Sequence, residues 1–337
     1  MKQVSVIGAG SWGTALAVLL ANNGHEVTIW SHDPHEVEML SKKREQQEKL
    51  PGVKLPDNVN VLSDMKESLT GKDVVVMAVP SPVVRSVAKQ MAPYISDGQV
   101  IVNVAKGIED GTYMTLSAII EEEIPNAEVC VLSGPSHAEE VGRGIPTTVV
   151  VGSKKQRIAE MLQDIFMNQV FRVYTNPDII GIELGGALKN VIALAAGTTD
   201  GLGYGDNTKA ALMTRGIAEL TRLGIALGGK PETFSGLTGI GDLIVTCTSV
   251  HSRNRKAGYL IGQGMTADEA MKEVKMVVEG VYSAKAALGL ARKYGVSVPI
   301  VEAVNKVLFE GADPKDEVTS LLLRERRKEH NNLEWEE

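Results

Sequence analysis

The start of the chain holds the feature that most constrains its fold, a glycine pattern between a short apolar strand and an apolar helix. The pattern is Gly8-x-Gly10-x-x-Gly13, it follows the apolar segment 4–7, and a second strand pattern lies at 27–30. The first glycine allows a tight turn, the second lets the backbone approach a pyrophosphate, and the third lets helix and strand pack closely. The helix N-terminus offers free N–H groups and a positive dipole end to phosphates. We expect a dinucleotide-binding unit here, the alternative being a purely structural turn.

Length, charge and cysteine content narrow the possible classes of protein. The 337 residues suggest about two domains, and a hydrophobic content of 43% is enough for packed cores. The net charge of −7 argues against general nucleic-acid binding. Cys130 and Cys247 lack CxxC spacing, which favours two free thiols in a reducing compartment. No His, Cys or Asp cluster has metal-ligand spacing, so we predict no metal site.

Two apolar segments bear on membrane insertion and secretion. The first strand pattern begins within four residues of Met1, which indicates that no secretory signal is present. The apolar run 15–21 is far shorter than the roughly 20 residues that span a bilayer. Segment 179–197 is also apolar, but Glu183 and Lys189 interrupt it. We read it as a buried helix of a soluble protein and expect no membrane insertion.

The first half of the chain alternates strand and helix patterns. Helices are predicted at 82–91 and 112–123, and the charged segment 36–54 is interpreted as a solvated helix and loop. Near-continuous Val and Ile runs are typical of strands buried on both faces of a parallel sheet. The predicted strands are 4–7, 27–30, 59–62, 73–79, 100–105, 129–132 and 147–151.

The second half is predicted to be helical. Asn176 is a favourable N-cap and Pro177 a favourable first helical residue. The charged tail 324–337 is interpreted as a frayed helix end. The predicted fold class is α/β, with an N-terminal Rossmann-type, mainly parallel sheet (1–180) that binds a dinucleotide and an all-helical C-terminal domain (181–337) that carries substrate and catalysis. Further helices are predicted at 209–227, 255–262, 266–275, 283–294 and 300–309.

Ligands of open α/β sheets bind at the carboxyl ends of the strands. Three predicted strand ends carry suggestive residues, namely Ser81, Lys106 and the segment 133–138. Lys106 stands beside a glycine, where it could meet a substrate oxygen or phosphate, although a surface lysine is the ordinary interpretation. His137 is interpreted as a loop histidine with its hydrogen bonds satisfied.

Lys189 is the sharpest anomaly of the helical half. It interrupts a helix that is otherwise nearly free of charge, and burial lowers the pKa of a lysine toward the range useful for proton transfer. Positions 185, 186, 193 and 196 share its face and are Gly, Gly, Ala and Ala. We expect a flat surface against which a ligand lies, the alternative being a lysine that extends to solvent at a helix–helix gap.

Two later loops are predicted to complete a site. Asp242 follows a Gly-x-Gly sequence and precedes Thr246, which places a carboxylate after a flexible turn. The segment 251–256 is basic and polar and opens a helix. Arg253 and backbone N–H groups there could bind a phosphate, although a solvated turn explains the segment equally well.

Taken together, these segments resemble the bacterial NAD(P)-dependent sn-glycerol-3-phosphate dehydrogenases. The family implies reduction of dihydroxyacetone phosphate to sn-glycerol 3-phosphate for phospholipid synthesis, in a cytoplasmic protein that is usually a dimer. The segments that carry the resemblance span nearly the whole chain in order and are Gly8–Ala17, Lys106–Glu109, Ser133–Glu139, Leu188–Val191, Asn207–Ala210, Gly239–Leu243 and Ser252–Asn254.

The resemblance implies a role for each matching residue. Lys189 is implied as proton donor and acceptor at the C2 oxygen, with Asp242 and Asn190 orienting its ammonium. The substrate phosphate and hydroxyl groups would meet Lys106, Gly134, Ser136, Lys189, Asp242, Ser252, Arg253 and Asn254. The dinucleotide would meet Gly8, Gly10, Ser11, Trp12, Gly13, His32, Asp33, Lys106, Ala138, Arg253, Val277 and Glu279.

The end of the second strand bears on the choice between NAD(H) and NADP(H). An Asp or Glu there binds the ribose 2′-OH in NAD-specific sites and repels a 2′-phosphate. Ser31 and His32, where family members often carry Arg in place of the histidine, donate hydrogen bonds instead. Asp33 lies one residue further on and could still reach a ribose hydroxyl. We expect both cofactors to be used, with a preference for NADPH.

Two alternatives remain from the residues themselves. A dehydrogenase of similar build could act on a β-hydroxy acid or a keto acid, but a carboxylate substrate does not need the cluster at 252–254 as a dianion site. A non-catalytic nucleotide sensor would be expected to have lost Lys189 or Asp242, and both are present.

Overall fold

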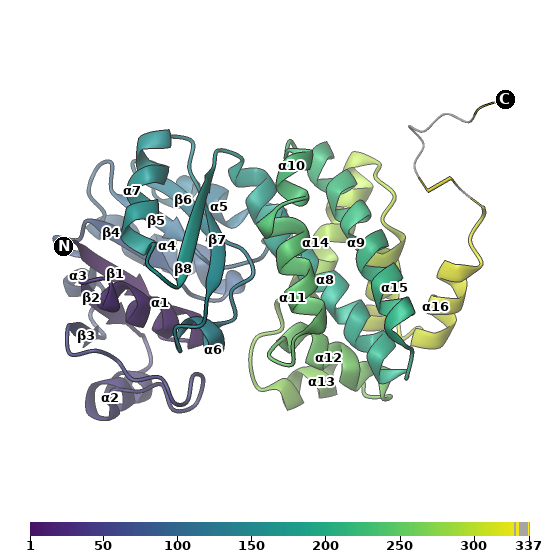
Figure 1. Cartoon of the computed structure of the whole chain (residues 1–337), viewed down its shortest axis with the longest axis horizontal. Helices are drawn as coiled ribbons and strands as arrows, with labels where there is room; N and C mark the ends of the chain where they lie inside the picture. The colour runs from purple at the N-terminus through teal and green to yellow at the C-terminus, as the bar shows by residue number, and fades with distance from the viewer. Residues whose placement is uncertain (327, 330–335, 337) are drawn as a thin grey trace.

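The protein was analysed as a computed structural model that describes residues 1–326, 328, 329 and 336. An eight-stranded sheet forms one part of the molecule and a helical assembly forms the other (Figure 1). The final helix, α16, spans Pro314–Leu322. Most of the tail that was interpreted as a frayed helix end lies outside the described residues.

The sheet has the order β3-β2-β1-β4-β5-β6-β7-β8. All neighbouring strands are parallel except β6 and β7, which confirms the mainly parallel sheet. The seven predicted strands are all present, with bounds that differ by at most two residues at either end. The strands are β1 (Gln3–Ile7), β2 (Glu26–Trp30), β3 (Val59–Leu62), β4 (Val74–Met77), β5 (Val100–Asn103), β6 (Glu128–Ser133), β7 (Thr147–Gly152) and β8 (Phe171–Asn176).

Strand β8 was not predicted. Phe171 and Val173 are buried while Arg172 and Tyr174 are exposed, so only alternate residues of this edge strand are apolar. Continuous Val and Ile runs, such as those of the predicted strands, belong to strands buried on both faces. An edge strand that shows one face to solvent has no such run.

Helices cover both faces of the sheet, and the sheet separates two apolar cores. Leu16 of α1 and Phe166 of α7 belong to one core, whereas Met91 of α4 and Ile120 of α5 belong to the other. The elements of this part are α1 (Ser11–Asn22), α2 (Pro34–Lys43), α3 (Met65–Leu69), η1 (Ser81–Val83), α4 (Val84–Met91), η2 (Ala92–Tyr94), α5 (Leu116–Glu123), α6 (Ala138–Val141) and α7 (Gln156–Phe166).

The helical part is built around the long helix α8, which spans Ile179–Gly201. Helix α12 crosses it closely because glycines meet there: a Cβ at Gly197 would overlap the carbonyl of Arg255, and one at Gly258 would overlap that of Leu194. The other elements are α9 (Asp206–Ala226), α10 (Pro231–Phe234), η3 (Leu237–Gly241), α11 (Asp242–Thr248), α12 (Arg253–Gly262), α13 (Ala267–Val274), α14 (Glu279–Tyr294) and α15 (Pro299–Phe309).

The prediction of Asn176 as the helix cap was wrong. Asn176 ends β8, and the Asp178 side chain instead accepts a hydrogen bond from the Gly181 N–H at 2.9 Å. The same carboxylate accepts from the Lys230 N–H and the Thr233 hydroxyl. A carboxylate serves the N-termini of both α8 and α10, which a single amide oxygen would do less well.

The interior position of α8 explains its apolar composition. By length and composition it could cross a membrane, but 89% of its apolar window is buried inside the protein, as in the core helix of a soluble protein.

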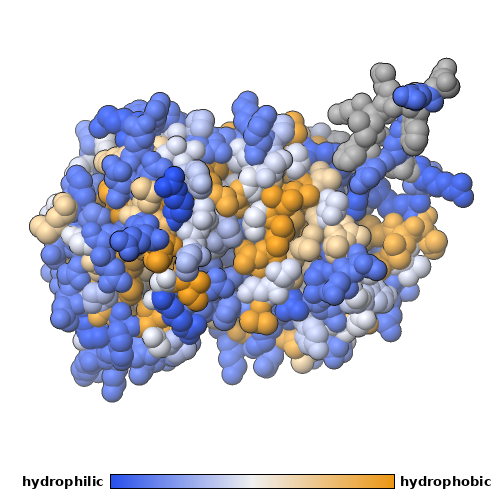
Figure 2. Space-filling view, viewed as in Figure 1, coloured by the Kyte–Doolittle hydropathy of each residue, from blue (hydrophilic) through white to orange (hydrophobic). Residues whose placement is uncertain are grey.

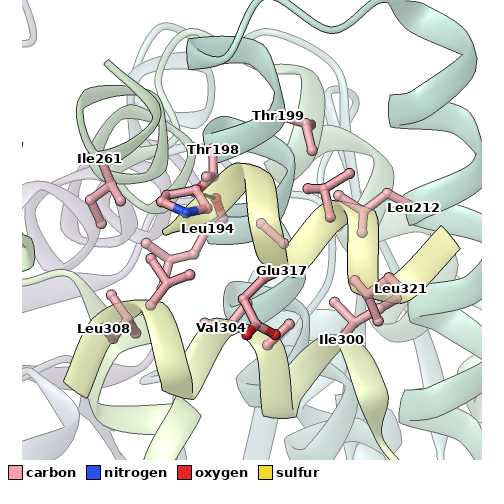
Figure 3. Close-up of a pocket in the computed structure, with 15 residues that line it drawn as sticks. Leu194, Thr198, Thr199, Leu212, Ile261, Ile300, Val304, Leu308, Glu317 and Leu321 are labelled. Carbon is pink, nitrogen blue, oxygen red and sulfur yellow. Dashed lines mark hydrogen bonds between the residues drawn. The ribbon is translucent and has the colours of Figure 1, made fainter. Parts of the chain in front are cut away.

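The C-terminal half of α8 also lines an apolar pocket of about 50 Å³ under α15 and α16, where Leu194, Leu212, Val304 and Leu321 meet (Figure 3).

Candidate active site

A cleft of about 1350 Å³ runs between the sheet and the helical part. The glycine turn and α1 line one end, and α8, α11 and α12 line the other. Of the residues predicted to bind ligands, all but three line this cleft: Gly13 and Gly134, which act through the backbone of two turns, and Asp33. The cleft is large enough for a dinucleotide and a small substrate together.

The glycine turn is shaped to receive a pyrophosphate. Gly8 has a φ of +116°, and a Cβ at Gly13 would overlap the Gly8 carbonyl, so neither position accommodates a larger residue. Gly10, the N-cap of α1, faces open space and provides no side-chain cap. The first N–H groups of α1 are thus free to meet phosphate oxygens. These features fit a dinucleotide.

The end of β2 differs from the sequence-based expectation. His32 is exposed and lines the cleft. Ser31, expected to face a 2′-phosphate, is buried and donates its hydroxyl to Glu36 at 2.6 Å. Asp33 accepts from the His35 N–H at 2.9 Å and caps α2. The side chains of Ser31 and Asp33, on either side of His32, are therefore engaged in hydrogen bonds within the protein.

Glu36 and Lys49 line the cleft but were not predicted as site residues. The interpretation of segment 36–54 as solvated was wrong for Glu36, which is only 5% exposed. A signal was present in the sequence, since Glu36 shares one helical face with the buried Met39 and Leu40. No local sequence pattern indicates that Lys49, further along the chain, forms an ion pair with Glu36.

Lys189, Asp242 and Lys106 form a buried charge cluster at the other end of the cleft. The Lys189 ammonium lies 2.5 Å from Asp242 Oδ1 and the Lys106 ammonium 2.7 Å from Oδ2. Lys189 also donates to the Thr246 hydroxyl at 2.6 Å, and Lys106 to the Gly134 carbonyl at 3.0 Å. The strand end of β5, helix α8 and the start of α11 are thus joined through one carboxylate.

Burial and neighbouring charges set the pKa values of this cluster. Burial is the main cause that lowers the pKa of Lys189 to about 8, the attraction of Asp242 opposes it, and the Lys106 charge adds to it. Burial works to raise the pKa of Asp242, but the two ammonium groups together hold that pKa below its usual value. A lysine in this state exchanges a proton near neutral pH.

Asn190 does not orient the Lys189 ammonium as expected. Its amide lies 3.4 Å from the Gly186 carbonyl, and its oxygen accepts from Asn254 at 3.0 Å. Asn254 in turn accepts from the Gly280 N–H at 2.8 Å. These contacts tie α8, α12 and α14 together, and the second partner of Lys189 is Thr246, which lies one turn into α11 and was expected in a loop.

The small-residue face of α8 is packed rather than open. A Cβ at Gly185 would meet the backbone of Thr238, and one at Gly186 would meet Ser133 and Lys106. The expected flat ligand surface is therefore filled by η3 and the strand ends. Small side chains let these elements approach Lys189 closely, which is what buries its ammonium.

The turn after β6 brings further polar groups to the cleft. The Ser136 hydroxyl donates to the Gly134 carbonyl at 2.9 Å, and Gly134 has a φ of +138°. Ala138 starts α6. His137 is not satisfied as predicted, because its Nε2 is buried without a hydrogen-bond partner. Burial, and next the Lys189 charge, lower the pKa of His137, and its ring lies 5.9 Å from that of His251.

The predicted phosphate segment opens α12. Ser252 is the N-cap, and its hydroxyl accepts from the Arg255 N–H at 3.2 Å. Arg253 donates to the Val277 carbonyl at 3.3 Å, and burial lowers the pKa of its guanidinium. Glu279 accepts from the N–H and the hydroxyl of Ser81, which links α14 to the end of β4.

A Rossmann-type sheet with a glycine turn at one end of a cleft and a buried lysine–carboxylate cluster at the other defines a nicotinamide-dependent dehydrogenase. Among the described residues, no three His, Cys, Asp or Glu side chains are grouped to hold a metal ion. Both cysteines are buried and unbridged.

Two family models match the chain, the N-terminus of NAD-dependent glycerol-3-phosphate dehydrogenase at 3–159 and its C-terminus at 178–319. The chain belongs to this family. It is 64% identical to glycerol-3-phosphate dehydrogenase (NAD(P)+) of Agathobacter rectalis over 99% of this chain and 100% of that protein. It is 53% identical to the Bacillus subtilis protein of the same name, over 99% and 97% of the two chains.

Solved structures agree with this assignment. The glycerol-3-phosphate dehydrogenase of Coxiella burnetii superposes with a TM-score of 0.93 at 37% identity, covering 96% of this chain and 99% of that one. A ketopantoate reductase from Ralstonia eutropha shares only the fold, with a TM-score of 0.62 at 16% identity over 94% and 99% of the chains. The resemblance stated from the sequence is thus confirmed.

Proposed function

We propose that this chain reduces dihydroxyacetone phosphate to sn-glycerol 3-phosphate with NAD(P)H, in a reversible reaction that supplies phospholipid synthesis. The observation that carries the proposal is the buried cluster of Lys189, Asp242 and Lys106 at the substrate end of the cleft. The family match and the names of its relatives support the same reaction.

The residues of the glycine turn and its surroundings are proposed to hold the dinucleotide. The free N–H groups of α1 bind its pyrophosphate, with Gly8, Gly10 and Gly13 shaping the turn. When bound, the nicotinamide supplies or accepts the hydride at C2 of the substrate. The other proposed contacts are Ser11, Trp12, His32, Asp33, Lys106, Ala138, Arg253, Val277 and Glu279.

Lys189 is proposed to give its proton to the C2 oxygen as that oxygen gains negative charge. Asp242 and Thr246 hold the ammonium in place, and the neutral amine left after transfer suits a buried site. In the reverse reaction the neutral amine takes the proton from the C2 hydroxyl. Lys106 stays paired with the same carboxylate, so it stabilises charge at the oxygen without leaving its position.

The substrate phosphate is proposed to lie at the start of α12. Arg253 supplies a partly buried cation, and the N-terminus of α12 supplies backbone N–H groups. The cluster of two ammonium groups and one carboxylate adds one net positive charge nearby. Proposed substrate contacts are Lys106, Gly134, Ser136, Lys189, Asp242, Ser252, Arg253 and Asn254.

Oxidation of NADPH and of NADH, followed by absorbance, tests the proposal. Dihydroxyacetone phosphate should be turned over, while dihydroxyacetone and a short keto acid should be poor substrates because they lack the phosphate dianion. Turnover of the keto acid but not the phosphate would identify a dehydrogenase of another specificity. Nucleotide binding without turnover of any of these substrates would identify a sensor.

We also propose that the protein is cytoplasmic and forms a homodimer. Each chain has a dinucleotide domain at 1–180 and a substrate domain at 181–337. The last strand ends at Asn176 and α8 begins at Ile179, which supports the division. Ile240 in η3 and Ile244 in α11 are exposed isoleucines. Figure 2 shows an apolar area on the surface of the helical part, and both observations support self-association. Light scattering after gel filtration, on the wild type and on Ile244→Asp, tests the dimer.

A further inference from the structure

A second charge pair lies at the opposite end of the cleft from Lys189, where β2 ends. The Glu36 carboxylate, in the first turn of α2, receives hydrogen bonds from Ser31 at 2.6 Å and from Gln46 at 3.3 Å. Lys49 completes the group with an ion pair to the same carboxylate. Both Glu36 and Lys49 line the cleft.

The pair is anchored to the phosphate-binding turn itself. Gln46 is fully buried and donates to the Ala9 carbonyl at 2.9 Å, between the first two glycines of the turn. Glu36 thus connects the end of β2, the turn and the segment after α2. A ligand bound at the turn lies beside this group, because the cleft runs from one to the other.

The exposure of the two side chains decides which charge a ligand meets. The Glu36 side chain is 7% exposed, whereas that of Lys49 is 39% exposed. Asp33, just before α2, is occupied in capping that helix. Of this pair, the charge that a ligand meets is therefore the Lys49 ammonium, and the Glu36 carboxylate lies behind it.

The two cofactors differ at one position of the adenosine ribose, which carries a 2′-OH in NADH and a 2′-phosphate in NADPH. The Glu36–Lys49 pair bears on the choice between these two groups. A carboxylate at the end of β2 accepts a hydrogen bond from a ribose 2′-OH and repels a 2′-phosphate. Here the carboxylate is present but covered by a cation. An ammonium presented to the ribose attracts a 2′-phosphate through a charge-assisted contact.

We propose that the Glu36–Lys49 ion pair determines cofactor preference: Lys49 binds the adenosine 2′-phosphate, and Glu36 is a positioning residue that holds Lys49 in place. The inference rests on the proposed function, since it requires the dinucleotide to bind at the glycine turn. Removing Lys49 uncovers the Glu36 carboxylate, which then favours the 2′-OH of NADH. The same covered carboxylate explains how one site can serve both cofactors.

Calorimetric titration with 2′,5′-ADP and 5′-ADP tests the proposal without depending on turnover. The wild type should prefer 2′,5′-ADP, and Lys49→Met should lower that preference by at least ~10-fold, the scale of one charge-assisted contact. Glu36→Gln should lower it by about 3-fold, because Lys49 is no longer held by an ion pair. The ratio of kcat/KM for NADPH and NADH should change in the same direction.

Two further variants are controls. Lys54→Met removes a lysine of the same segment that pairs with Glu45 and does not line the cleft, and it should leave both affinities unchanged. Lys49→Arg keeps the charge and should retain the preference. Thermal unfolding of each variant checks that it is folded, and Glu36→Gln, which should also lower the preference, carries the test if Lys49→Met does not fold.

The outcomes separate this inference from the proposed function. If the wild type binds both nucleotides but Lys49→Met keeps its preference for 2′,5′-ADP, the inference is overturned. The same holds if His32→Ala removes the preference and Lys49→Met does not. If the wild type binds neither nucleotide, the dinucleotide site, and with it the proposed function, is wrong.

Discussion

The two ends of the cleft are built in opposite ways. At the cofactor end, the glycine turn is made of residues 8–13, and Gly13 lies against the Gly8 carbonyl within the same motif. At the substrate end, Asp242 binds Lys189, 53 positions away, and Lys106, 136 positions away. The first end can be recognised from a short motif, whereas the second exists only after the helical part packs on the sheet. Substitutions at the substrate end should therefore lower turnover or substrate binding, whereas substitutions at the cofactor end should lower cofactor affinity.

The largest effect is expected at the substrate end. Lys189→Ala should lower kcat for dihydroxyacetone phosphate reduction by at least ~10²-fold, the scale of a lost general acid. NADPH affinity should barely change, because the glycine turn does not depend on this lysine. Steady-state kinetics and a fluorescence titration of NADPH measure the two quantities. Near-normal turnover would remove Lys189 from the proton-transfer step and make Lys106 the next candidate.

Arg253→Ala should have the next largest effect, confined to phosphorylated substrate. We expect kcat/KM for dihydroxyacetone phosphate to fall by ~10- to 100-fold, because a charge-assisted contact to a dianion is lost. The weak activity on dihydroxyacetone should fall much less. An equal loss with both substrates would show that Arg253 serves the cofactor or the fold, since it also contacts the Val277 carbonyl.

At the cofactor end, Gly13→Ala should weaken NADPH binding by about 10-fold with a smaller change in kcat at saturating cofactor. The added Cβ overlaps the Gly8 carbonyl, so the turn must shift and the N–H groups of α1 move with it. Gly205→Ala, just before α9, is a control at a glycine with a negative φ and no such contact. Unchanged NADPH affinity in Gly13→Ala would contradict the role of the turn.

The smallest effect concerns pH. Lys189 donates its proton only below its pKa of about 8, so reduction should slow by about 2-fold at pH 8 and further above it, while oxidation should speed up. Asp242→Asn removes the attraction that raises the pKa of Lys189. The midpoint of the pH dependence of the reduction rate should therefore move to lower pH in this variant. Pre-steady-state rates between pH 6 and 10 measure the midpoint. A midpoint that does not move in Asp242→Asn would mean that another group controls the profile.

The same contrast appears in what the sequence analysis missed. Seven strands and the long helices were predicted because each has its own apolar periodicity. Strand β8 and helix α11 were missed, since one is an edge strand and the other a short helix with Gly-rich surroundings. Thr246 and Lys49 were not given roles, because their partners, Lys189 and Glu36, are distant in the sequence and no local pattern indicates either contact.

The sequence by itself determined the parts of this protein that depend on neighbouring residues. These are the parallel sheet, the glycine turn before α1, the change to helices after residue 176, and the family to which the chain belongs. Backbone sterics and apolar periodicity act over a few residues, so they can be read along the chain.

The tertiary structure alone decided which polar groups meet and which are buried. It placed Thr246 rather than Asn190 against the Lys189 ammonium, left His137 Nε2 without a partner, and covered the Glu36 carboxylate with Lys49. The pKa of a lysine depends on burial and on charges within a few ångströms, whatever their distance along the chain. That dependence is why the hydrogen-bond partners and the pKa of Lys189 could be established only from the folded chain.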